Sequence, residues 1–232
     1  MCGRYTLSVN AEEIAAHFSA VWRDLGLTAH MPRFNAAPGQ RLPIVRAGQQ
    51  GPEIVTAHWG LIPFWAKEAS IGAGLFNARA DSIAMKPAFK AAFKRRRCLV
   101  PANGFYEWKS GTAPRGPKQP YHLALKPGGL MAFAGIWERW TSPQGETIES
   151  FAIITTEANA TVKPIHDRMP VIVPPEHYAR WLGVTRDPAY VLTLIEPTPA
   201  SALRAVAVGT LVNHADRDAP DCIAPIDLPM PR

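Results

Sequence analysis

Apolar and polar positions alternate in short stretches along most of the chain, and Gly, Pro, Asn and Asp residues separate these stretches. Alternation with a period of two is typical of strands that bury one face. Residues 34–38 are expected to form a loop, and residues 109–120, 126–129 and 141–145 predict hairpin connections. The expected strands lie near residues 4–8, 42–46, 53–59, 98–101, 104–108, 121–126, 130–137, 147–155, 171–173 and 203–210.

Helical spacing of apolar residues is limited to a few segments. The longest starts with a capping signature at Asn10 and ends at Gly26. A second helix is expected over residues 87–94, with a proline at its first position. Two more are expected near residues 175–182 and 188–195, so the sequence predicts short helices between strands.

Composition adds bounds on the architecture. The length of 232 residues is near the upper end for one domain, and no linker divides the chain. We therefore expect a single domain over residues 1–232, with an irregular tail at residues 211–232. Hydrophobic residues make up 47% of the chain, which is ordinary for a protein with a sizeable core. The 23 prolines are scattered, which favours rigid loops over disorder.

The net charge of +6 favours an anionic partner, nucleic acid first, although a merely soluble basic protein has the same balance. The strongest basic run, at residues 94–97, fits either phosphate contact or a solvated helix end. The chain opens without an apolar signal region, and no run of about 18 apolar residues occurs in it. We expect a soluble protein with no membrane partner, which is cytoplasmic, or nuclear if its source is eukaryotic.

The three cysteines differ in what they can do. An odd count without C-x-x-C spacing argues against a disulfide framework and a thiolate metal site. Cys98 lies in an apolar run and is expected to be a small buried hydrophobe, and nothing distinguishes Cys222 from an ordinary thiol. Cys2 follows Met1, and removal of Met1 would leave an α-amine and a thiol on adjacent carbons. That pair can condense with an aldehyde and close a thiazolidine ring, or the amine can act as base for its own thiol.

Two further positions are candidates for acid–base chemistry. Glu107 interrupts the aromatic residues 105–108, where a carboxylate must be exposed by alternation, paired or functional. His166 lies in a His-Asp-Arg turn between two prolines, which makes it a better candidate acid or base than an isolated histidine. The aromatic residues within 59–65 fit either a core or a platform on which nucleobases stack.

Seven stretches complete the pattern, and together they span almost the whole chain. They are Met1-Cys2-Gly3-Arg4-Tyr5, Phe34-Asn35-Ala36-Ala37-Pro38, Trp59-Gly60-Leu61-Ile62-Pro63, Asn77-Ala78-Arg79-Ala80-Asp81, Cys98-Leu99-Val100-Pro101, Gly104-Phe105-Tyr106-Glu107-Trp108 and Ile165-His166-Asp167-Arg168-Met169-Pro170. In this order they resemble the SRAP family, the SOS response-associated peptidases. The resemblance implies an α+β fold, a single β-rich antiparallel pseudo-barrel with short peripheral helices. Near the C-terminus the chain departs from the family pattern at His214, to which we assign no role.

The resemblance also implies a function in the DNA damage (SOS) response. The protein would sense abasic sites in single-stranded DNA and form a covalent thiazolidine crosslink through processed Cys2. Asn77, Glu107 and His166 would complete the catalytic site. The resemblance implies no metal or organic cofactor, a monomer, and weak lyase activity from the Schiff base. DNA would be contacted by Arg4, Pro38, Trp59, Trp65, Arg79, Trp108 and Arg168.

Two other functions stay open at this point. The first is an N-terminal-cysteine peptidase or amidase, whose chief reaction would be removal of Met1 by Cys2 with Glu107 and His166. Glutamine amidotransferases also begin Met-Cys-Gly, but neither a second synthase domain nor their glutamine-binding motifs are found. The second is a non-catalytic module for single strands or modified bases, which would bind in a salt-sensitive way without a covalent product.

Overall fold

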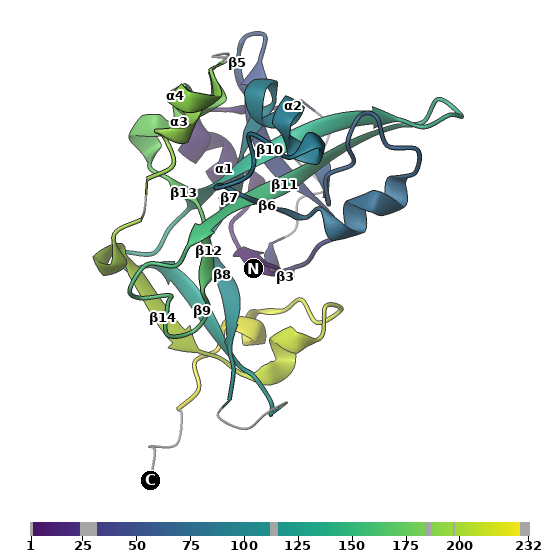
Figure 1. Ribbon diagram of the computed structural model, residues 1–232. Helices are drawn as coiled ribbons and strands as arrows, with labels where there is room; N and C mark the ends of the chain where they lie inside the picture. Colours follow the sequence, from purple (N-terminus) through teal and green to yellow (C-terminus); the bar gives the residue numbers. More distant parts are fainter. Residues whose placement is uncertain (1, 24–31, 112–115, 184–186, 197, 228–232) are drawn as a thin grey trace.

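The computed structural model describes residues 2–23, 32–111, 116–183, 187–196 and 198–227 (Figure 1). Strands dominate these segments, as the alternating pattern predicts. The strands are β1 (Tyr5–Leu7), β2 (Val21–Trp22), β3 (Arg33–Ala36), β4 (Arg41–Gly48), β5 (Gly51–Trp59), β6 (Asn77–Arg79), β7 (Arg97–Ala102), β8 (Gly104–Lys109), β9 (Gln119–Leu125), β10 (Met131–Thr141), β11 (Thr147–Glu157), β12 (Arg168–Pro170), β13 (Ile172–Val173) and β14 (Leu203–Ala207). The α-helices are α1 (Ala11–Phe18), α2 (Pro87–Arg95), α3 (Tyr178–Leu182) and α4 (Pro188–Leu192).

Five strands of the larger sheet close into a ring. β11, β10, β7, β4 and β5 pair in that order, each antiparallel to the next. β5 then returns to β11 through a parallel pairing in which Phe151 faces Trp59. The rings of these two residues are completely buried and stacked, with centroids 6.2 Å apart. The predicted β-rich pseudo-barrel is therefore confirmed, although its closing pair is parallel.

The smaller sheet carries the N-terminal strand. Its order is β14-β9-β8-β1-β3, and all its pairs are antiparallel. Tyr5 of β1 is completely buried, and its ring lies 5.2 Å from that of Trp59 in the barrel. The β1 strand is thus clamped between two neighbours in its own sheet and packed against the barrel.

The helices cover one end of the barrel, and the C-terminal segment lies at the other end beside β8 and β9 (Figure 1). α2 matches the expected helix and buries Phe89 and Phe93 on its inner face. α1 is shorter than predicted: its cap at Asn10 is confirmed by a 2.8 Å hydrogen bond from the Glu13 N–H, but the helix ends at Phe18. Ser19 takes the left-handed conformation there, and the next apolar pair forms β2.

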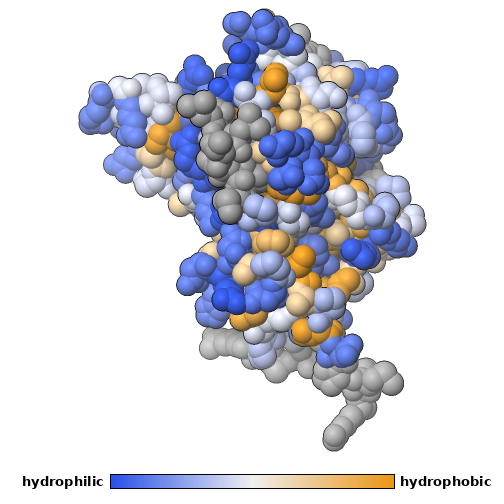
Figure 2. All heavy atoms as spheres, turned by 180° about the vertical axis from the view of Figure 1, so that it is seen from behind, coloured by the Kyte–Doolittle hydropathy of each residue, from blue (hydrophilic) through white to orange (hydrophobic). Residues whose placement is uncertain are grey.

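The described part of the segment expected to be an irregular tail, residues 211–227, contains short helical turns. Residues Thr210–Asn213 and Pro220–Ile223 form 3₁₀ helices, and Val208 forms a bridge with Pro225. The face opposite to that in Figure 1 is mostly hydrophilic, with apolar side chains reaching the surface in patches (Figure 2). Within the described segments, no helix has the length and apolar character needed to span a membrane.

Candidate active site

The beginning of the chain is held by strand pairing and by one side chain. Tyr5 and Thr6 pair with β8, and Tyr5 pairs on its other side with β3. The Cys2 carbonyl accepts a 2.7 Å hydrogen bond from Nδ2 of Asn77, which lies on β6. The oxygen of the same amide, Oδ1, is buried and has no hydrogen-bond partner among the described residues. Asn77 therefore orients Cys2 and still offers an acceptor.

The Cys2 side chain is completely buried. Burial raises the pKa of its thiol, and the nearby charge of Glu107 raises it further. A thiol in these surroundings is neutral at pH 7, because the thiolate would lose its hydration and face a carboxylate. The thiol is thus kept protonated until a base or a change of charge beside it removes the proton.

Glu107 lies on β8, where four successive residues are buried instead of alternating. Its neighbours pack against both faces of the smaller sheet, so the carboxyl side chain is only 3% exposed. This burial raises the pKa of Glu107 to about 7. A carboxyl group with a pKa near the operating pH can both accept and donate a proton, which is the requirement for general acid–base catalysis.

His166 faces this carboxyl group. Its Nε2 lies 3.9 Å from Oε2 of Glu107, and its Nδ1 accepts a 2.9 Å hydrogen bond from the Arg168 N–H. Desolvation lowers the pKa of His166, and the Asp167 carboxylate partly opposes this effect. The ring is therefore neutral at pH 7, and its Nε2 is the ring nitrogen that faces Glu107.

Two of the predicted phosphate contacts lie together beside Asn77. Arg79 and Arg168 both contact the Asp81 carboxylate, at 2.8 Å and 3.4 Å. Arg168 is largely buried, and its Nη2 donates to the Thr155 carbonyl at 2.7 Å. The Arg79 side chain remains 56% exposed, so its guanidinium can still meet a ligand at the surface.

Two other predicted DNA contacts point at the C-terminal segment. Nη1 of Arg4 donates to Asn35 at 3.0 Å and to the Val212 carbonyl at 2.6 Å. The Trp108 indole donates to Asn213 at 2.7 Å. These side chains hold residues 212–213 against the smaller sheet.

The aromatic residues of the 59–65 segment separate into core and surface. Trp59 is completely buried and donates its indole N–H to the Phe76 carbonyl at 2.9 Å. The predicted contact of Trp59 with DNA is therefore wrong, because a buried ring in the core offers no face to a base. Trp65 is 49% exposed, and Pro38 is half-buried in the turn that follows β3.

Sequence reasoning missed three residues that shape the site. Thr155 and Asp81 fix the two arginines: Thr155 lies in none of the quoted motifs, whereas Asp81 ends the motif that contains Arg79. The Asn35 amide donates to the carbonyls of Val212, His214 and Arg217 and so binds the C-terminal segment. Asn35 lies inside one of the motifs quoted for the resemblance, which was the available signal.

The two other cysteines have free, buried thiols. Cys98 is buried as predicted, and Cys222 is buried in a small cluster with Tyr106, Val208 and Val212. Across the described ranges, no three His, Cys, Asp or Glu side chains gather as ligands of a metal ion would. The groups that the structure brings together are thus Cys2, Asn77, Glu107 and His166.

Comparison with known proteins places this arrangement in a family. The family model described as SOS response associated peptidase (SRAP) matches residues 1–215, which include all these groups. The chain belongs to the SRAP family. It is similar to the abasic site processing protein YoqW of Bacillus subtilis, with 38% identity over 225 residues that cover 96% of this chain and 99% of that protein.

More distant relatives are also similar to the chain over most of its length. The abasic site processing protein HMCES of Mus musculus is 32% identical over 247 residues, which cover 89% of this chain and 68% of that one. A crystal structure of a protein from Bacteroides thetaiotaomicron superposes with a TM-score of 0.88 at 27% identity, covering 97% of this chain and 100% of that one. The family model therefore covers residues 1–215, and the fold of the solved structure is shared over 97% of this chain.

Proposed function

We propose that this protein recognises abasic sites in single-stranded DNA and links to them covalently through Cys2 after Met1 has been removed. Two relatives, 38% and 32% identical, are named abasic site processing proteins. The observation that carries the proposal is the buried Glu107 carboxyl, whose pKa is about 7 and whose charge acts on the Cys2 thiol. His166, 3.9 Å from that carboxyl, supplies a second proton-transfer group.

The proposed reaction uses the open-chain aldehyde of the abasic sugar. The neutral α-amine of Cys2 attacks the aldehyde carbon, water leaves, and a Schiff base forms. The thiol then adds across the C=N bond: sulfur bonds to carbon, the proton passes to nitrogen, and a five-membered thiazolidine closes. β-Elimination from the Schiff base would instead break the strand, and ring closure competes with it, so lyase activity is expected to be weak.

Each side chain meets a need of this reaction. An α-amine has a pKa of about 7.7–8.0 and is mostly protonated at pH 7, so a base must remove its proton. Glu107 is half ionised near that pH and can accept this proton, then return it to the departing hydroxyl. The imidazole of His166 can transfer a proton to the sugar oxygen as the ring opens. The free Oδ1 of Asn77 can accept from the amine.

DNA contacts complete the proposal. Arg79 keeps an exposed guanidinium that can bind a flanking phosphate, and Arg168 supports it through their shared carboxylate. Trp65 and Pro38 present surface that can stack on or separate neighbouring bases. Arg4 and Trp108 would act indirectly, by holding the C-terminal segment beside the N-terminal strand.

The same groups favour hydrolysis of the Met1–Cys2 peptide bond as a second activity. The family description as a peptidase supports it, and Glu107 and His166 provide the proton transfers. Water would add its hydroxyl to the Met1 carbonyl carbon and its proton to the Cys2 nitrogen. This step would release the amine that the crosslinking reaction requires.

A denaturing gel tests the proposal. Protein whose N-terminus has been verified by mass spectrometry is incubated with a single strand that carries one abasic site, with the intact strand, and with a duplex. We expect a heat-stable shifted band only with the abasic single strand, and no such band from Cys2→Ala. Crosslinking by Cys2→Ala equal to that of the unmodified protein would overturn the proposal. Cleavage of peptides in trans without any DNA adduct would favour a peptidase instead.

A further inference from the structure

A groove of about 860 Å³ lies between α2 and the strand β10, and it includes none of the groups of the candidate active site. Lys90, Lys94 and Arg95 line one side of it, and Trp137 and Arg139 of β10 lie at its base. Phe64 and Trp65, from the segment that follows β5, form the other side. The groove thus combines a basic wall with an aromatic wall.

The basic wall carries charge that is not neutralised by the ion pairs of the described residues. Arg96 is bound to Glu138 and Arg139 to Glu149, each at 2.6 Å. Lys90, Lys94 and Arg95 are exposed and take part in none of the ion pairs found in the described part of the chain. Lys90 and Lys94 are one helical turn apart, so their ammonium groups project from the same face of α2.

The four residues of the basic run 94–97 have different surroundings in the structure. Arg97 is buried and donates to the Trp181 carbonyl at 2.7 Å, so it belongs to the core rather than to a ligand. Arg96 is held by its ion pair. Lys94 and Arg95 are the members of the run that remain available for phosphate.

The aromatic wall is exposed and held in place. Phe64 and Trp65 are 58% and 49% exposed, which is unusual for such large apolar side chains. Their segment is fixed, because Trp140 donates to the Ala66 carbonyl at 2.7 Å. At the base of the groove, the Arg46 guanidinium lies 4.4 Å from the ring of Trp137 and holds that indole from behind. Fixed exposed rings beside free cations are typical of single-strand binding surfaces.

The groove and the candidate active site are joined by one strand. On β11, Ile153 pairs with Asn77 of the site, and Glu149 binds Arg139 of the groove. Four residues separate these two positions, which corresponds to about 13 Å along an antiparallel strand. A single DNA strand that enters the site can therefore reach the groove within a few nucleotides.

We propose that this groove binds the phosphates and bases of the same DNA strand on one side of the abasic site that reacts at Cys2. The inference rests on the proposed function for the identity of the strand. It extends the contact already proposed for Trp65: Lys90, Lys94 and Arg95 bind phosphates while Phe64 and Trp65 stack on bases. Its effect is to hold the strand before and during the reaction, not to take part in the chemistry.

Charge removal in the groove tests this proposal. A triple variant, Lys90→Gln, Lys94→Gln and Arg95→Gln, keeps side chains that favour a helix. Its matched control is Lys126→Gln, Arg180→Gln and Arg204→Gln, which removes three exposed charges away from the groove. Both sets are made in the Cys2→Ala background, so that non-covalent binding of an intact single strand is measured as a function of salt.

We expect the groove variant to lower the slope of log affinity against log salt by about 2, because each lost single-strand phosphate contact accounts for about 0.7. Affinity at about 0.1 M salt should fall roughly 10- to 100-fold, with a much smaller change in the control and in binding of duplex. Equal losses in the groove and control variants, or an unchanged slope, would overturn the proposal. Equal thermal melting of the two variants excludes unfolding as the cause.

A second measurement separates this inference from the proposed function. With Cys2 intact, crosslinking is followed on abasic strands that are lengthened on the 5′ side or on the 3′ side. The groove variant should lose the gain from lengthening on one side only, while a minimal abasic strand should react at the unmodified rate. If the parent protein forms no crosslink, the proposed function fails, whereas the salt slopes with intact strand still decide whether the groove binds DNA.

Discussion

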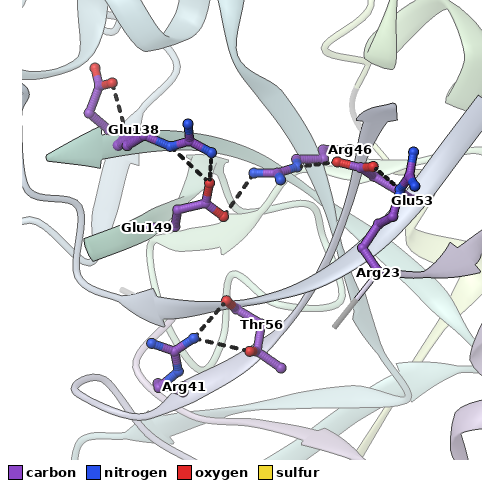
Figure 3. A network of polar contacts seen from close by, with 8 residues as sticks. Arg23, Arg41, Arg46, Glu53, Thr56, Glu138 and Glu149 are labelled. Atoms are coloured by element: carbon purple, nitrogen blue, oxygen red, sulfur yellow. Dashed lines mark hydrogen bonds and ion pairs between the residues drawn. The ribbon is translucent and has the colours of Figure 1, made fainter. Parts of the chain in front are cut away.

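Glu53 and Glu107 are buried carboxylates of the same chain with opposite electrostatic surroundings. Glu53 accepts hydrogen bonds from Arg46 and Arg23, each at 2.8 Å (Figure 3). Burial alone would raise the pKa of Glu53, but the two arginines outweigh it and the pKa is lowered. At Glu107 burial dominates, and the pKa rises to about 7 beside a neutral His166.

Because their surroundings differ, one glutamate is a structural anion and the other is a candidate acid–base group. Glu53 belongs to a chain of ion pairs that continues through Arg46, Glu149 and Arg139 and joins four strands of the barrel (Figure 3). A carboxylate held by guanidinium groups is a fixed anion that cannot exchange protons near pH 7. Glu107 lies where the barrel and the smaller sheet meet, and its proton can be exchanged at that pH.

Removal of the ionisable group at position 107 is expected to have the largest effect, and this effect is on crosslinking. Glu107→Gln should slow crosslinking to an abasic single strand about 10²- to 10⁴-fold, because the amide can neither accept nor return a proton. In the unmodified protein the rate should rise through pH 7 as Glu107 ionises, and the variant should lose that limb of the profile. Single-turnover rates measure both. Glu53→Gln is the control and should retain the normal pH profile; a normal rate in Glu107→Gln would contradict the assignment.

A smaller effect is expected on stability. The pKa of Glu107 is raised from an ordinary 4.5 to about 7 in the folded protein, so the fold favours the protonated form. Its contribution is fully present below about pH 4.5 and is lost as the pH rises through about 7, up to about 3 kcal/mol. Glu107→Gln should remove this part of the pH dependence of unfolding by urea. A variant whose stability falls with pH as steeply as that of the parent would count against a raised pKa.

The smallest effect is expected when the ion pairs of Arg46 are removed, and it is on the free energy of unfolding. Arg46→Met leaves Glu53 and Glu149 each without one guanidinium and removes the cation beside Trp137. Because these side chains are only partly buried, we expect a loss of about 2 kcal/mol in the free energy of unfolding, between the values for exposed and buried pairs. A double-mutant cycle with Glu53→Gln isolates the pair. A crosslinking rate that fell as far as that of Glu107→Gln would show that the two regions are not separate.

Much of the fold could be predicted because the strands of the barrel are long enough to show their period. The strands β4, β5 and β7–β11 and the helix α2 lie where the sequence pattern predicts them. The strands β2, β3, β6 and β12 were missed because each has only two to four residues and owes its extended conformation to a partner strand. Residues 34–36, predicted to lie in a loop, belong to β3, and residues 168–170, predicted to lie in a turn, form β12. Long-range pairing of this kind leaves no local signal.

Only part of the candidate site could be predicted from the sequence. The chemistry of Cys2 and the odd position of Glu107 follow from the residues themselves, but that they lie close to Asn77 and His166 came from the family resemblance. The aromatic stretch could not distinguish Trp59 in the core from Trp65 at the surface, because both fit the same local pattern. Burial depends on how the barrel closes, which no window of sequence contains.

The most direct test of the central claim is mass spectrometry of the covalent product. Protein is reacted with an abasic single strand, treated with borohydride, digested and sequenced. The account predicts an adduct on an N-terminal peptide that begins at Cys2, with the mass of peptide plus DNA fragment minus one water. It should resist reduction, because a closed thiazolidine has no C=N bond. An adduct on a lysine, on a peptide that retains Met1, or one converted quantitatively by borohydride would contradict it.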